Sequence, residues 1–321
     1  MSGGQTGVTA FAPGGVGNIG PGLDILGLAL AGAGDSVRAE WHGAPGIHIL
    51  DAGHPELPPD PGRHTAGLAA QAVVGHAKDH RCGERGIALT VCKGLPLSGG
   101  QGGSAASAVA GAFAVNALLG NPLARPALVE ACLAAEEQVS GRHADNIAPS
   151  LFGGIVLIRS LDPLDLVELP VPDDLFVVIV RPDQRLRTME ARSVLPQEIP
   201  RATALYQAAQ VGAMVAALAS GDYALLGRAI DDRIAEPVRA ALLPGFREAQ
   251  QAALAAGALG SSISGSGPSA FALVRGTVIG QRVGEAMARA YATCGQRSHV
   301  RVASIDREGA RLIDDRGNAP T

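Results

Sequence analysis

The chain has 321 residues, of which 47% are hydrophobic and 17% charged, a composition typical of a folded globular protein and not of a disordered one. Its net charge is −4 and no block of Lys or Arg occurs, so we expect no nucleic-acid partner. Four scattered cysteines, no signal peptide and no long apolar run predict a cytoplasmic protein without disulfides or a membrane span.

Short β-branched runs alternate along the chain with alanine-rich stretches of helical periodicity. The predicted strands are Val8–Phe11, Ser36–Trp41, Gly46–Leu50, Gly86–Cys92, Gly154–Ile158, Phe176–Val180, Ala270–Val274 and His299–Ala303. The predicted helices are Ala66–His80, Ser104–Leu119, Arg125–Ser140, Ala202–Ala219, Ala224–Asp231, Arg247–Ala256 and Thr277–Cys294. Short connections between the first strands indicate an α+β fold. Residues 160–174, rich in proline and acidic residues, are predicted to connect two halves.

The first of three glycine-rich strips, APGGVGNIGPGLD at residues 12–24, contains the G-x-G-x-x-G spacing of dinucleotide-binding turns. In such turns the third glycine leads directly into a helix that receives the pyrophosphate. Here Pro-Gly follows Gly20 and makes a poor helix start, so the context argues against a dinucleotide site. A plain structural turn stays open, but it leaves the polar pair Asn18 and Asp24 unexplained.

The second strip, LPLSGGQGGSAA at residues 95–106, runs directly into a helix of small residues. Its glycines let backbone N–H groups face an anion, and the helix N-terminus adds partial positive charge, which favours a phosphate site. The alternative is a serine-capped helix after a flexible loop. No G-K-[ST] lysine is present, so amides, Mg²⁺ and arginine would have to balance the phosphate charge. The third strip, SSISGSGPS at residues 261–269, predicts either a loop that closes over a ligand or a tight turn.

Together these strips resemble the motifs of the GHMP kinase superfamily. PLSGGQGGSAA is similar to its phosphate motif P-x-x-x-G-L-G-S-S-A-A, with Gln101 in place of leucine and Gly103 in place of the first serine. Within the superfamily, four further segments resemble motifs of the homoserine kinase family. They are PGGVGNIGPGLDILGLA at 13–29, HADNIAPSLFGG at 143–154, DRIAEPVRAALLPGF at 232–246 and ISGSGP at 263–268.

The resemblance implies a two-domain GHMP kinase-like fold of the α+β class. An N-terminal ribosomal-protein-S5-like α/β domain, residues 1–160, would bind the nucleotide through the phosphate loop 96–106. A C-terminal ferredoxin-like α+β domain, residues 161–321, would complete the substrate pocket. The implied activity is ATP-dependent, Mg²⁺-assisted phosphorylation of the L-homoserine hydroxyl, a step toward threonine, by a homodimer. Two alternatives stay open: a superfamily kinase for another small hydroxylated metabolite, and a non-catalytic relative that binds ATP and a ligand.

The resemblance also implies the site residues. The nucleotide would be bound by His64, which stands where this family often carries an asparagine near the adenine, and by Pro96, Ser98, Gly99, Gly100, Gln101, Gly102, Gly103, Ser104 and Ala105. The substrate pocket would contain Asn18, Asp24, His143, Asp145, Asn146, Thr188, Arg192, Arg239 and Gly265. Catalysis would involve Ser104, Glu136, Asp145 and Asn146, with Ser104 and Glu136 as the ligands of Mg²⁺.

Residue chemistry fits these implied roles. An arginine fork, from Arg192 or Arg239, suits a carboxylate, and Asp24 suits an ammonium group. Two acids are candidates for the Mg²⁺ site, Glu136 and its neighbour, and because adjacent helical residues point about 100° apart only one faces inward. We choose Glu136. Asp145 is assigned first as a pocket residue, and a role as base stays open.

Overall fold

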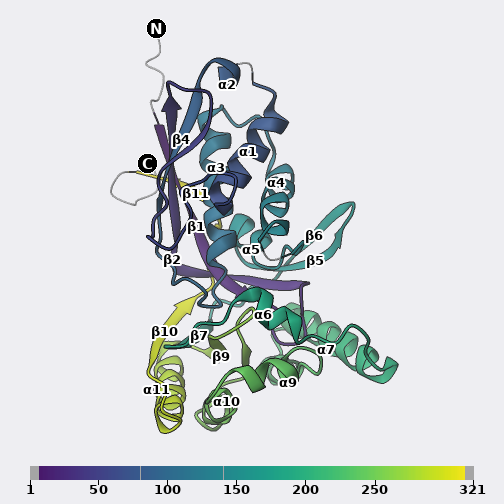
Figure 1. Cartoon of the computed structure of the whole chain (residues 1–321). Coiled ribbons are helices and arrows are strands. Elements are labelled where there is room, and N and C mark those ends of the chain that lie inside the picture. Colours follow the sequence, from purple (N-terminus) through teal and green to yellow (C-terminus); the bar gives the residue numbers. More distant parts are fainter. Residues whose placement is uncertain (1–6, 80, 140, 315–321) are drawn as a thin grey trace.

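The computed structural model describes residues 7–79, 81–139 and 141–314. Figure 1 shows two layered bodies that meet along the long strand β2, Leu26–His42. Each body is a β-sheet with helices packed against it, so the predicted α+β class is confirmed. The far ends of the predicted domains, residues 1–6 and 315–321, lie outside the described residues, as do His80 and Ser140, where two predicted helices were expected to end.

The first body contains a seven-stranded sheet with the order β11-β1-β2-β4-β3, to which β5 and β6 are joined through β2. Its pairings are antiparallel except for β3 with β4. Besides β2, its strands are β1 (Gly7–Gly17), β3 (Gly46–Asp51), β4 (Gly86–Cys92), β5 (Ile155–Leu161), β6 (Leu164–Leu169) and β11 (Arg311–Ile313). The helices of this body are α1 (Thr65–Ala77), α2 (Arg81–Glu84), α3 (Gly103–Leu118), α4 (Arg125–Glu137) and α5 (Ile147–Phe152).

Helix α3 is the centre of this body and carries the phosphate strip at its start. Most of its residues are buried, on every side of the helix. Helices α1 and α4 pack closely against α3, and the sheet covers its remaining face. Such close packing leaves room only for small side chains, which explains the alanine and glycine residues around the helix. The same packing fixes the direction of its N-terminus, which points toward the second body.

The second body contains a four-stranded antiparallel sheet with the order β10-β7-β9-β8. Its strands are β7 (Leu175–Pro182), β8 (Gly260–Ile263), β9 (Ala270–Arg275) and β10 (Ser298–Ser304). Its helices are α6 (Thr188–Ser193), α7 (Arg201–Ser220), α8 (Tyr223–Ala229), α9 (Glu236–Arg239), α10 (Phe246–Ala255) and α11 (Thr277–Thr293), with a 3-10 turn η1 (Ala240–Leu242) after α9.

Strand β7 is buried on both faces, which explains its continuous apolar sequence. Val178 and Val180 pack in one cluster with α10 and α11, whereas Val177 and Ile179 pack in another with α7 and α8. That second cluster also includes Leu26, Leu28 and Leu30 of β2. An apolar core therefore joins the two bodies and fixes the walls of the space between them.

Two glycine-rich segments form strands that were not predicted. Residues 12–17, predicted as part of a loop, continue β1, with a shift in register between Pro13 and Gly15. Residues 26–35 form the first half of β2, where a single strand over 36–41 was predicted. Glycine has a low strand propensity, so these segments are held by their pairing partners and not by their own sequence.

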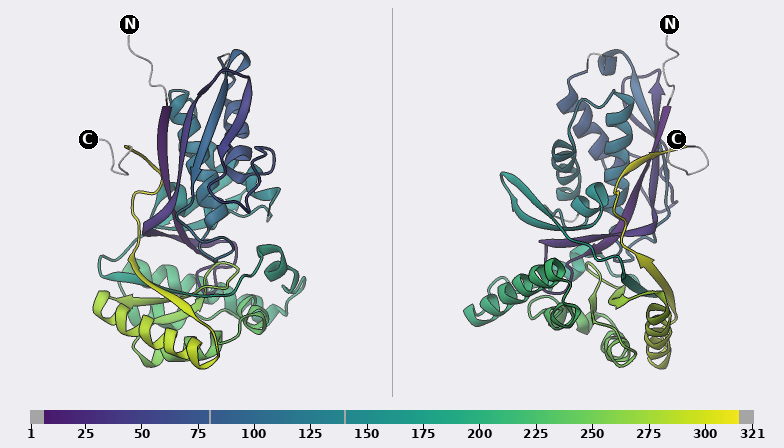
Figure 2. Two further views of the ribbon diagram at one scale, coloured as in Figure 1. Left: turned by 60° about the vertical axis from the view of Figure 1, so that its left-hand side comes forward. Right: turned by 180° about the vertical axis from the view of Figure 1, so that it is seen from behind.

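The strand pairings also differ from the predicted division at residue 160. Residues 160–174, predicted as a connector, contain the end of β5 and all of β6, which form a hairpin on the first sheet. Strand β11 returns from the second body and pairs with β1 (Figure 2). Two segments assigned to the C-terminal domain thus hydrogen-bond in the N-terminal sheet. The short elements α2, α5, α6, α9, β8 and β11 were not predicted.

Within the described residues, helix α7 is long and apolar enough to cross a membrane, and only 22% of its most apolar window is buried. One such helix is weak evidence for a membrane span, because helices of globular proteins pass the same test. The predicted absence of a membrane partner therefore stays a prediction.

Candidate active site

A cavity of about 550 Å³ lies between the two bodies, and both contribute to its wall. The wall includes these predicted site residues: Asn18, His64, Pro96, Ser98, Gly99, Gly100, Gly102, Gly103, Ser104, Glu136, His143, Asp145, Asn146, Thr188, Arg192, Arg239 and Gly265. Residues far apart in the sequence are thus brought to one place, as expected from the motifs.

Three predicted residues do not line the cavity. The carbonyl of Gln101 accepts a hydrogen bond from the Gly15 amide, 3.1 Å away, and its side chain is buried. Ala105 is only 1% exposed because it faces the core of the first body. Asp24 is turned toward an arginine beside the cavity. The predicted contacts of Gln101 and Ala105 with a nucleotide are therefore limited to their backbone.

The phosphate strip forms a concave row of backbone amides. Its φ angles are positive at alternate positions: 50° at Ser98, 70° at Gly100 and 67° at Gly102. This alternation turns successive N–H groups toward one point, the geometry of an anion-binding nest. The amides of residues 98–105 donate no hydrogen bond to another described residue. Free donors at the N-terminus of α3 therefore face the cavity, where the helix dipole also favours an anion.

The carbonyl groups of the same loop are held from outside. Ser269 Oγ donates to the Gly99 oxygen and Ser264 Oγ to the Gly100 oxygen, each at 2.6 Å. Both serines belong to the third strip, which was predicted to close over a ligand or to form a tight turn. The strip does form a tight turn, closed by the Gly267 amide donating to the Ser264 carbonyl at 2.9 Å. This turn supports the loop from behind, since a Cβ on Gly100 would lie 2.7 Å from backbone oxygens of the strip. The carbonyl dipoles are thus satisfied, and the amides are left for a ligand.

Next to this loop, Ser104 and Glu136 contact each other. The Ser104 hydroxyl lies 3.1 and 3.2 Å from the two carboxylate oxygens of Glu136. Glu136 is 4% exposed and lines the cavity, whereas Glu137 is exposed on the outer face of α4. A hydroxyl and a buried carboxylate beside free amides are the hard oxygen donors that suit Mg²⁺.

Arg239 also lines the cavity and is 1% exposed. Its Nε donates to the Ala191 carbonyl and its Nη1 to the Gly265 carbonyl, both at 3.1 Å. Its buried Nη2 donates no hydrogen bond to a described residue. Burial, together with the nearby charge of Arg192, lowers the pKa of Arg239. A fixed guanidinium whose Nη2 donates to no described residue is suited to a ligand carboxylate.

Arg192 of α6 pairs with Asp24, the last residue of the first strip. Nη2 lies 2.5 Å from Asp24 Oδ1 and Nη1 lies 3.2 Å from Oδ2. Asn18 Oδ1 accepts a hydrogen bond of 2.7 Å from the Asp24 amide and so fixes the turn. Arg192 Nε is buried and donates to no described residue. Arg192 was predicted to bind the carboxylate of the substrate and Asp24 its ammonium group. In this structure the two side chains bind each other.

Asp145 and Asn146 line the cavity next to the phosphate loop, where a Cβ on Gly102 would lie 2.8 Å from Asn146 Oδ1. Asp145 is 1% exposed and its Oδ1 forms a long ion pair with His143, whereas Asn146 Oδ1 is buried without a hydrogen-bond partner among the described residues. Gly17 of the first strip is needed here, because a Cβ at that position would overlap Asp145 Oδ2 and Asn146 Nδ2. Unpaired buried oxygens are costly in a folded protein, and they are typical of a ligand-binding surface.

His143 lies beside this pair, with Nδ1 3.5 Å from Asp145 Oδ1. Burial alone would disfavour the charged ring, but the Asp145 carboxylate outweighs burial and raises the pKa of His143. One ligand atom from each of Asp24, His143 and Asp145 lies within 4.8 Å of the others. Carboxylates thus gather at the end of the cavity where the two arginines lie.

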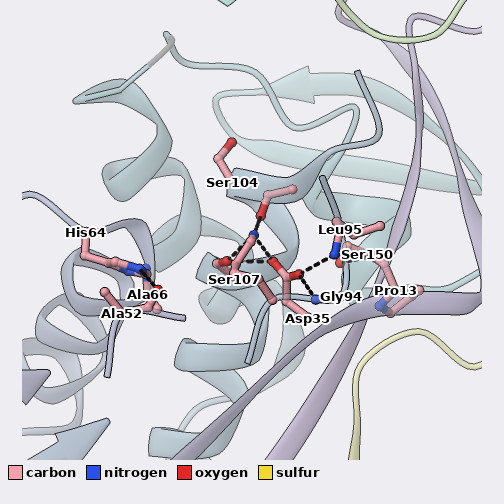
Figure 3. Close-up of polar contacts among 12 residues, drawn as sticks. Pro13, Asp35, Ala52, His64, Ala66, Gly94, Leu95, Ser104, Ser107 and Ser150 are labelled. Carbon is pink, nitrogen blue, oxygen red and sulfur yellow. Dashed lines mark hydrogen bonds and ion pairs between the residues drawn. The ribbon is translucent and has the colours of Figure 1, made fainter. Parts of the chain in front are cut away.

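His64 lies at the edge of the cavity, but its ring serves the fold. Nδ1 accepts a hydrogen bond of 3.2 Å from the Ala66 amide and caps α1, and Nε2 lies 3.3 Å from the Ala52 carbonyl (Figure 3). Burial lowers the pKa of His64, in keeping with a neutral ring. Both nitrogens are therefore occupied, and the ring offers a nucleotide base only a nonpolar contact.

Sequence reasoning missed two charged residues behind the phosphate loop. Asp35 is wholly buried in β2 and binds Lys93. Lys93 lines the cavity, although no lysine was predicted at the phosphate site. One signal was available: Lys93 is one of only two lysines in a chain whose other basic residues are arginines.

Comparison with known proteins agrees with this geometry. The family model described as GHMP kinases N terminal domain matches residues 68–154, which include the phosphate loop, and the model described as GHMP kinases C terminal matches residues 214–293. A homoserine kinase from Chlorobium phaeovibrioides is 44% identical over 318 residues, which cover 95% of this chain and 99% of that protein. The chain belongs to the homoserine kinase family. A homoserine kinase from Arabidopsis thaliana is also 44% identical, over 96% of this chain and 85% of that one.

The fold of this homoserine kinase family member agrees as well. A crystal structure of homoserine kinase from Cytophaga hutchinsonii has a TM-score of 0.92 and 39% identity, and covers 98% of this chain and 99% of its own. A mevalonate kinase from L. major has a TM-score of 0.66 at 18% identity, over 94% and 96% of the two chains, which shows a shared fold. The expected two-domain GHMP kinase fold is therefore confirmed.

Proposed function

We propose that this protein transfers the γ-phosphoryl group of ATP to the side-chain hydroxyl of L-homoserine. One observation carries the proposal: unpaired donors for an anion and unpaired groups for a small zwitterion line the same cavity. The names of the relatives that align over nearly the whole chain point to the same reaction.

The nucleotide end is assigned to the amides of residues 98–105 and the N-terminus of α3. Its support is the row of unpaired N–H groups with carbonyls held behind it. Ser104 and Glu136 are the residues that would hold Mg²⁺, and their oxygen chemistry and burial fit that ion. When bound there, Mg²⁺ would neutralise part of the negative charge of the phosphate groups.

The homoserine end is assigned to the two arginines and the nearby carboxylates. Arg239 Nη2 and Arg192 Nε are buried donors without a described partner, and together they suit the substrate carboxylate. Asp24 and Asp145 suit the substrate ammonium. When homoserine binds between Arg192 and Asp24, the ion pair between these two side chains separates. Each side chain then contacts the oppositely charged group of the substrate, so the number of charge contacts does not fall.

The chemistry we propose is a direct in-line displacement. The homoserine hydroxyl oxygen forms a bond to the γ-phosphorus, the bond to the β,γ-bridging oxygen breaks, and that electron pair leaves with ADP. The hydroxyl proton passes to Asp145 Oδ1 or to the transferred phosphoryl group. Since phosphoryl transfer is loose, positioning by Asn146 and charge stabilisation by the loop amides provide most of the acceleration.

The test is ADP release from the purified protein with Mg²⁺ and ATP, compared for L-homoserine, L-serine, L-threonine, mevalonate and shikimate. We expect turnover with L-homoserine far above the other acceptors. Turnover with another acceptor instead would assign the protein to that metabolite. ATP binding without release of ADP on any acceptor would support a non-catalytic relative.

We also propose an assembly and a location for the protein. We expect a homodimer, as the family resemblance implies, and light scattering of the purified protein measures its mass. The four cysteines are free, which supports a reducing compartment such as the cytoplasm.

A further inference from the structure

Asp35 is a buried carboxylate that no step of the proposed reaction uses. It is 0% exposed and accepts from four groups (Figure 3). Oδ1 accepts from the amides of Gly94 and Leu95, at 3.1 and 3.2 Å, and Oδ2 accepts from Ser107 Oγ at 2.7 Å and from the ammonium of Lys93. A charge removed so fully from water requires this full set of partners.

Lys93 is equally saturated by the protein. Besides Asp35, its Nζ donates to the Gly103 carbonyl at 3.0 Å and to Ser107 Oγ at 2.9 Å. An ammonium group has three N–H donors, and all three are thus used. Although Lys93 lines the cavity, it has no free donor for a phosphate oxygen. Its role therefore differs from that of the lysine in a G-K-[ST] loop.

These contacts join the two ends of the phosphate loop. Asp35 fixes the entry through the Gly94 and Leu95 amides, and Lys93 fixes the exit through Gly103, the first residue of α3. Helix α3 has no side-chain cap of its own, because its N-cap residue is Gly102. The span between entry and exit contains the unpaired amides that face the cavity.

We propose that the Asp35–Lys93 pair positions the phosphate loop, setting the spacing of its amides for a nucleotide without touching the nucleotide. The inference rests on the proposed function only in taking the ligand of the loop to be a nucleoside triphosphate. It assigns Asp35 and Lys93 as positioning residues, and it predicts an effect on nucleotide binding that exceeds any general effect on stability.

The first test compares Asp35→Asn with Asp306→Asn. Asp306 is a matched control: it is 6% exposed, accepts from the amides of Glu308 and Gly309, and pairs with Arg311, away from the cavity. Calorimetric titration with MgATP, without any acceptor, measures the dissociation constant of each folded variant. We expect Asp35→Asn to raise it about tenfold, because Lys93 and the Gly94 and Leu95 amides lose the carboxylate that holds the loop in shape, and Asp306→Asn to leave it unchanged.

The second test adds Lys93→Met to Asp35→Asn. Both substitutions break the same Asp35–Lys93 contact, so the double variant is expected to bind MgATP about as weakly as Asp35→Asn alone. A direct phosphate contact by Lys93 instead predicts a further loss of affinity in the double variant, and that result would overturn the proposal. Unchanged affinity in folded Asp35→Asn, or an equal loss in Asp306→Asn, would also overturn it.

A milder variant covers the case in which Asp35→Asn does not fold. Ser107→Ala removes one hydrogen bond from each member of the pair, and Ser261→Ala removes one equally buried bond, to the Phe271 carbonyl, in the second sheet. We expect a several-fold weaker affinity for MgATP in Ser107→Ala alone.

In steady state the KM of Ser107→Ala for ATP should rise while its KM for the acceptor stays unchanged. Equal affinities in the two serine variants would contradict the proposal. Because MgATP binding is measured without an acceptor, failure of homoserine phosphorylation leaves this test intact.

Discussion

Arg192 binds Asp24 through two hydrogen bonds, 2.5 Å from Nη2 to Oδ1 and 3.2 Å from Nη1 to Oδ2. The pair links α6 of the second body to the turn after β1 in the first body. Because the two side chains suit opposite ends of an amino acid, the pair keeps the pocket electrically balanced before the substrate enters. Substrate binding then replaces an internal contact with two contacts to the zwitterion.

Loss of the arginine fork should affect homoserine and not ATP. Arg192→Lys keeps the charge but removes the bidentate geometry, so we expect the KM for L-homoserine to rise roughly 30-fold, since a charged hydrogen bond contributes about 2 kcal/mol. The KM for ATP should stay unchanged. Arg275→Lys, which alters an exposed pair with Asp174, is the matched control. An unchanged KM for homoserine in Arg192→Lys would argue against the assigned carboxylate contact.

Asp145→Asn separates the two roles left open for Asp145. We expect the KM for L-homoserine to rise while kcat falls by less than about tenfold, because loose phosphoryl transfer needs little help from a base. A general base contributes about 100-fold or more, so a fall in kcat of that size at saturating homoserine would assign the proton to Asp145. Circular dichroism and the affinity for MgATP serve as controls for the fold.

The two cavity histidines should titrate in opposite directions. The pKa of His143 is raised from its ordinary value of 6.5, and the pKa of His64 is lowered from the same value. Charged His143 therefore adds to the free energy of unfolding in full below pH 6.5, and this contribution is lost as pH rises through its raised pKa. Neutral His64 contributes above pH 6.5, and that contribution is lost as pH falls through its lowered pKa.

NMR titration of the ring protons measures both values directly. In Asp145→Asn the pKa of His143 should fall, whereas the pKa of His64 should not change. In urea unfolding, His143→Gln should lack the loss of stability that the native chain shows above pH 6.5. A pKa of His143 that is unaffected by Asp145→Asn would rule out the carboxylate as its cause.

Two adjacent glycines of the phosphate loop should respond differently to alanine. A Cβ at Gly103 meets its nearest neighbour, Lys93 Nζ, at an ordinary 3.5 Å, so Gly103→Ala should raise the free energy of unfolding by about 0.5–1 kcal/mol and keep ATP affinity. At Gly102 the φ angle is 67° and a Cβ would lie 2.8 Å from Asn146 Oδ1. Gly102→Ala should therefore lower the free energy of unfolding by more than about 1 kcal/mol. It should also lower kcat/KM by a factor that corresponds to more than about 1 kcal/mol of transition-state stabilisation.

Chemical denaturation and coupled kinetics on the two variants check this prediction. Gly103→Ser, which restores the hydroxyl usual at this position in the superfamily, should behave as Gly103→Ala does. Similar losses of unfolding free energy and of kcat/KM in Gly102→Ala and Gly103→Ala would contradict this prediction. They would mean that the loop tolerates a side chain at neither position.

The motifs identified most of the site because each is local in the sequence. A row of glycines beside a helix start, or an Asp-Asn pair after a histidine, carries its own chemistry, and the fold then brings such segments together. Asp35 and Lys93 are 58 residues apart, and neither lies in a phosphate motif of known spacing. Their meeting depends on the pairing of β2 with β4, which sequence patterns alone do not specify.

The missed strands have a similar cause. The first half of β2 and the end of β1 are rich in glycine and alanine, which gives them no β-branched signal, but their pairing lets Asp145 and Asn146 approach the backbone at Gly17. Likewise β11 has three residues and is held by long-range pairing with β1. Low strand propensity at these positions accompanies the close approach that the site requires.

The pairing of β11 with β1 also bears on how the chain is made. Thr9 of β1 is paired with Ile313 of β11. The outer edge of β1 therefore stays uncovered until nearly all of the described residues have been synthesised. Until then the ribosome-bound protein exposes an unpaired strand edge on the sheet that carries the phosphate loop. The first sheet is therefore completed only after the strands of the second sheet, β7 to β10, have been synthesised.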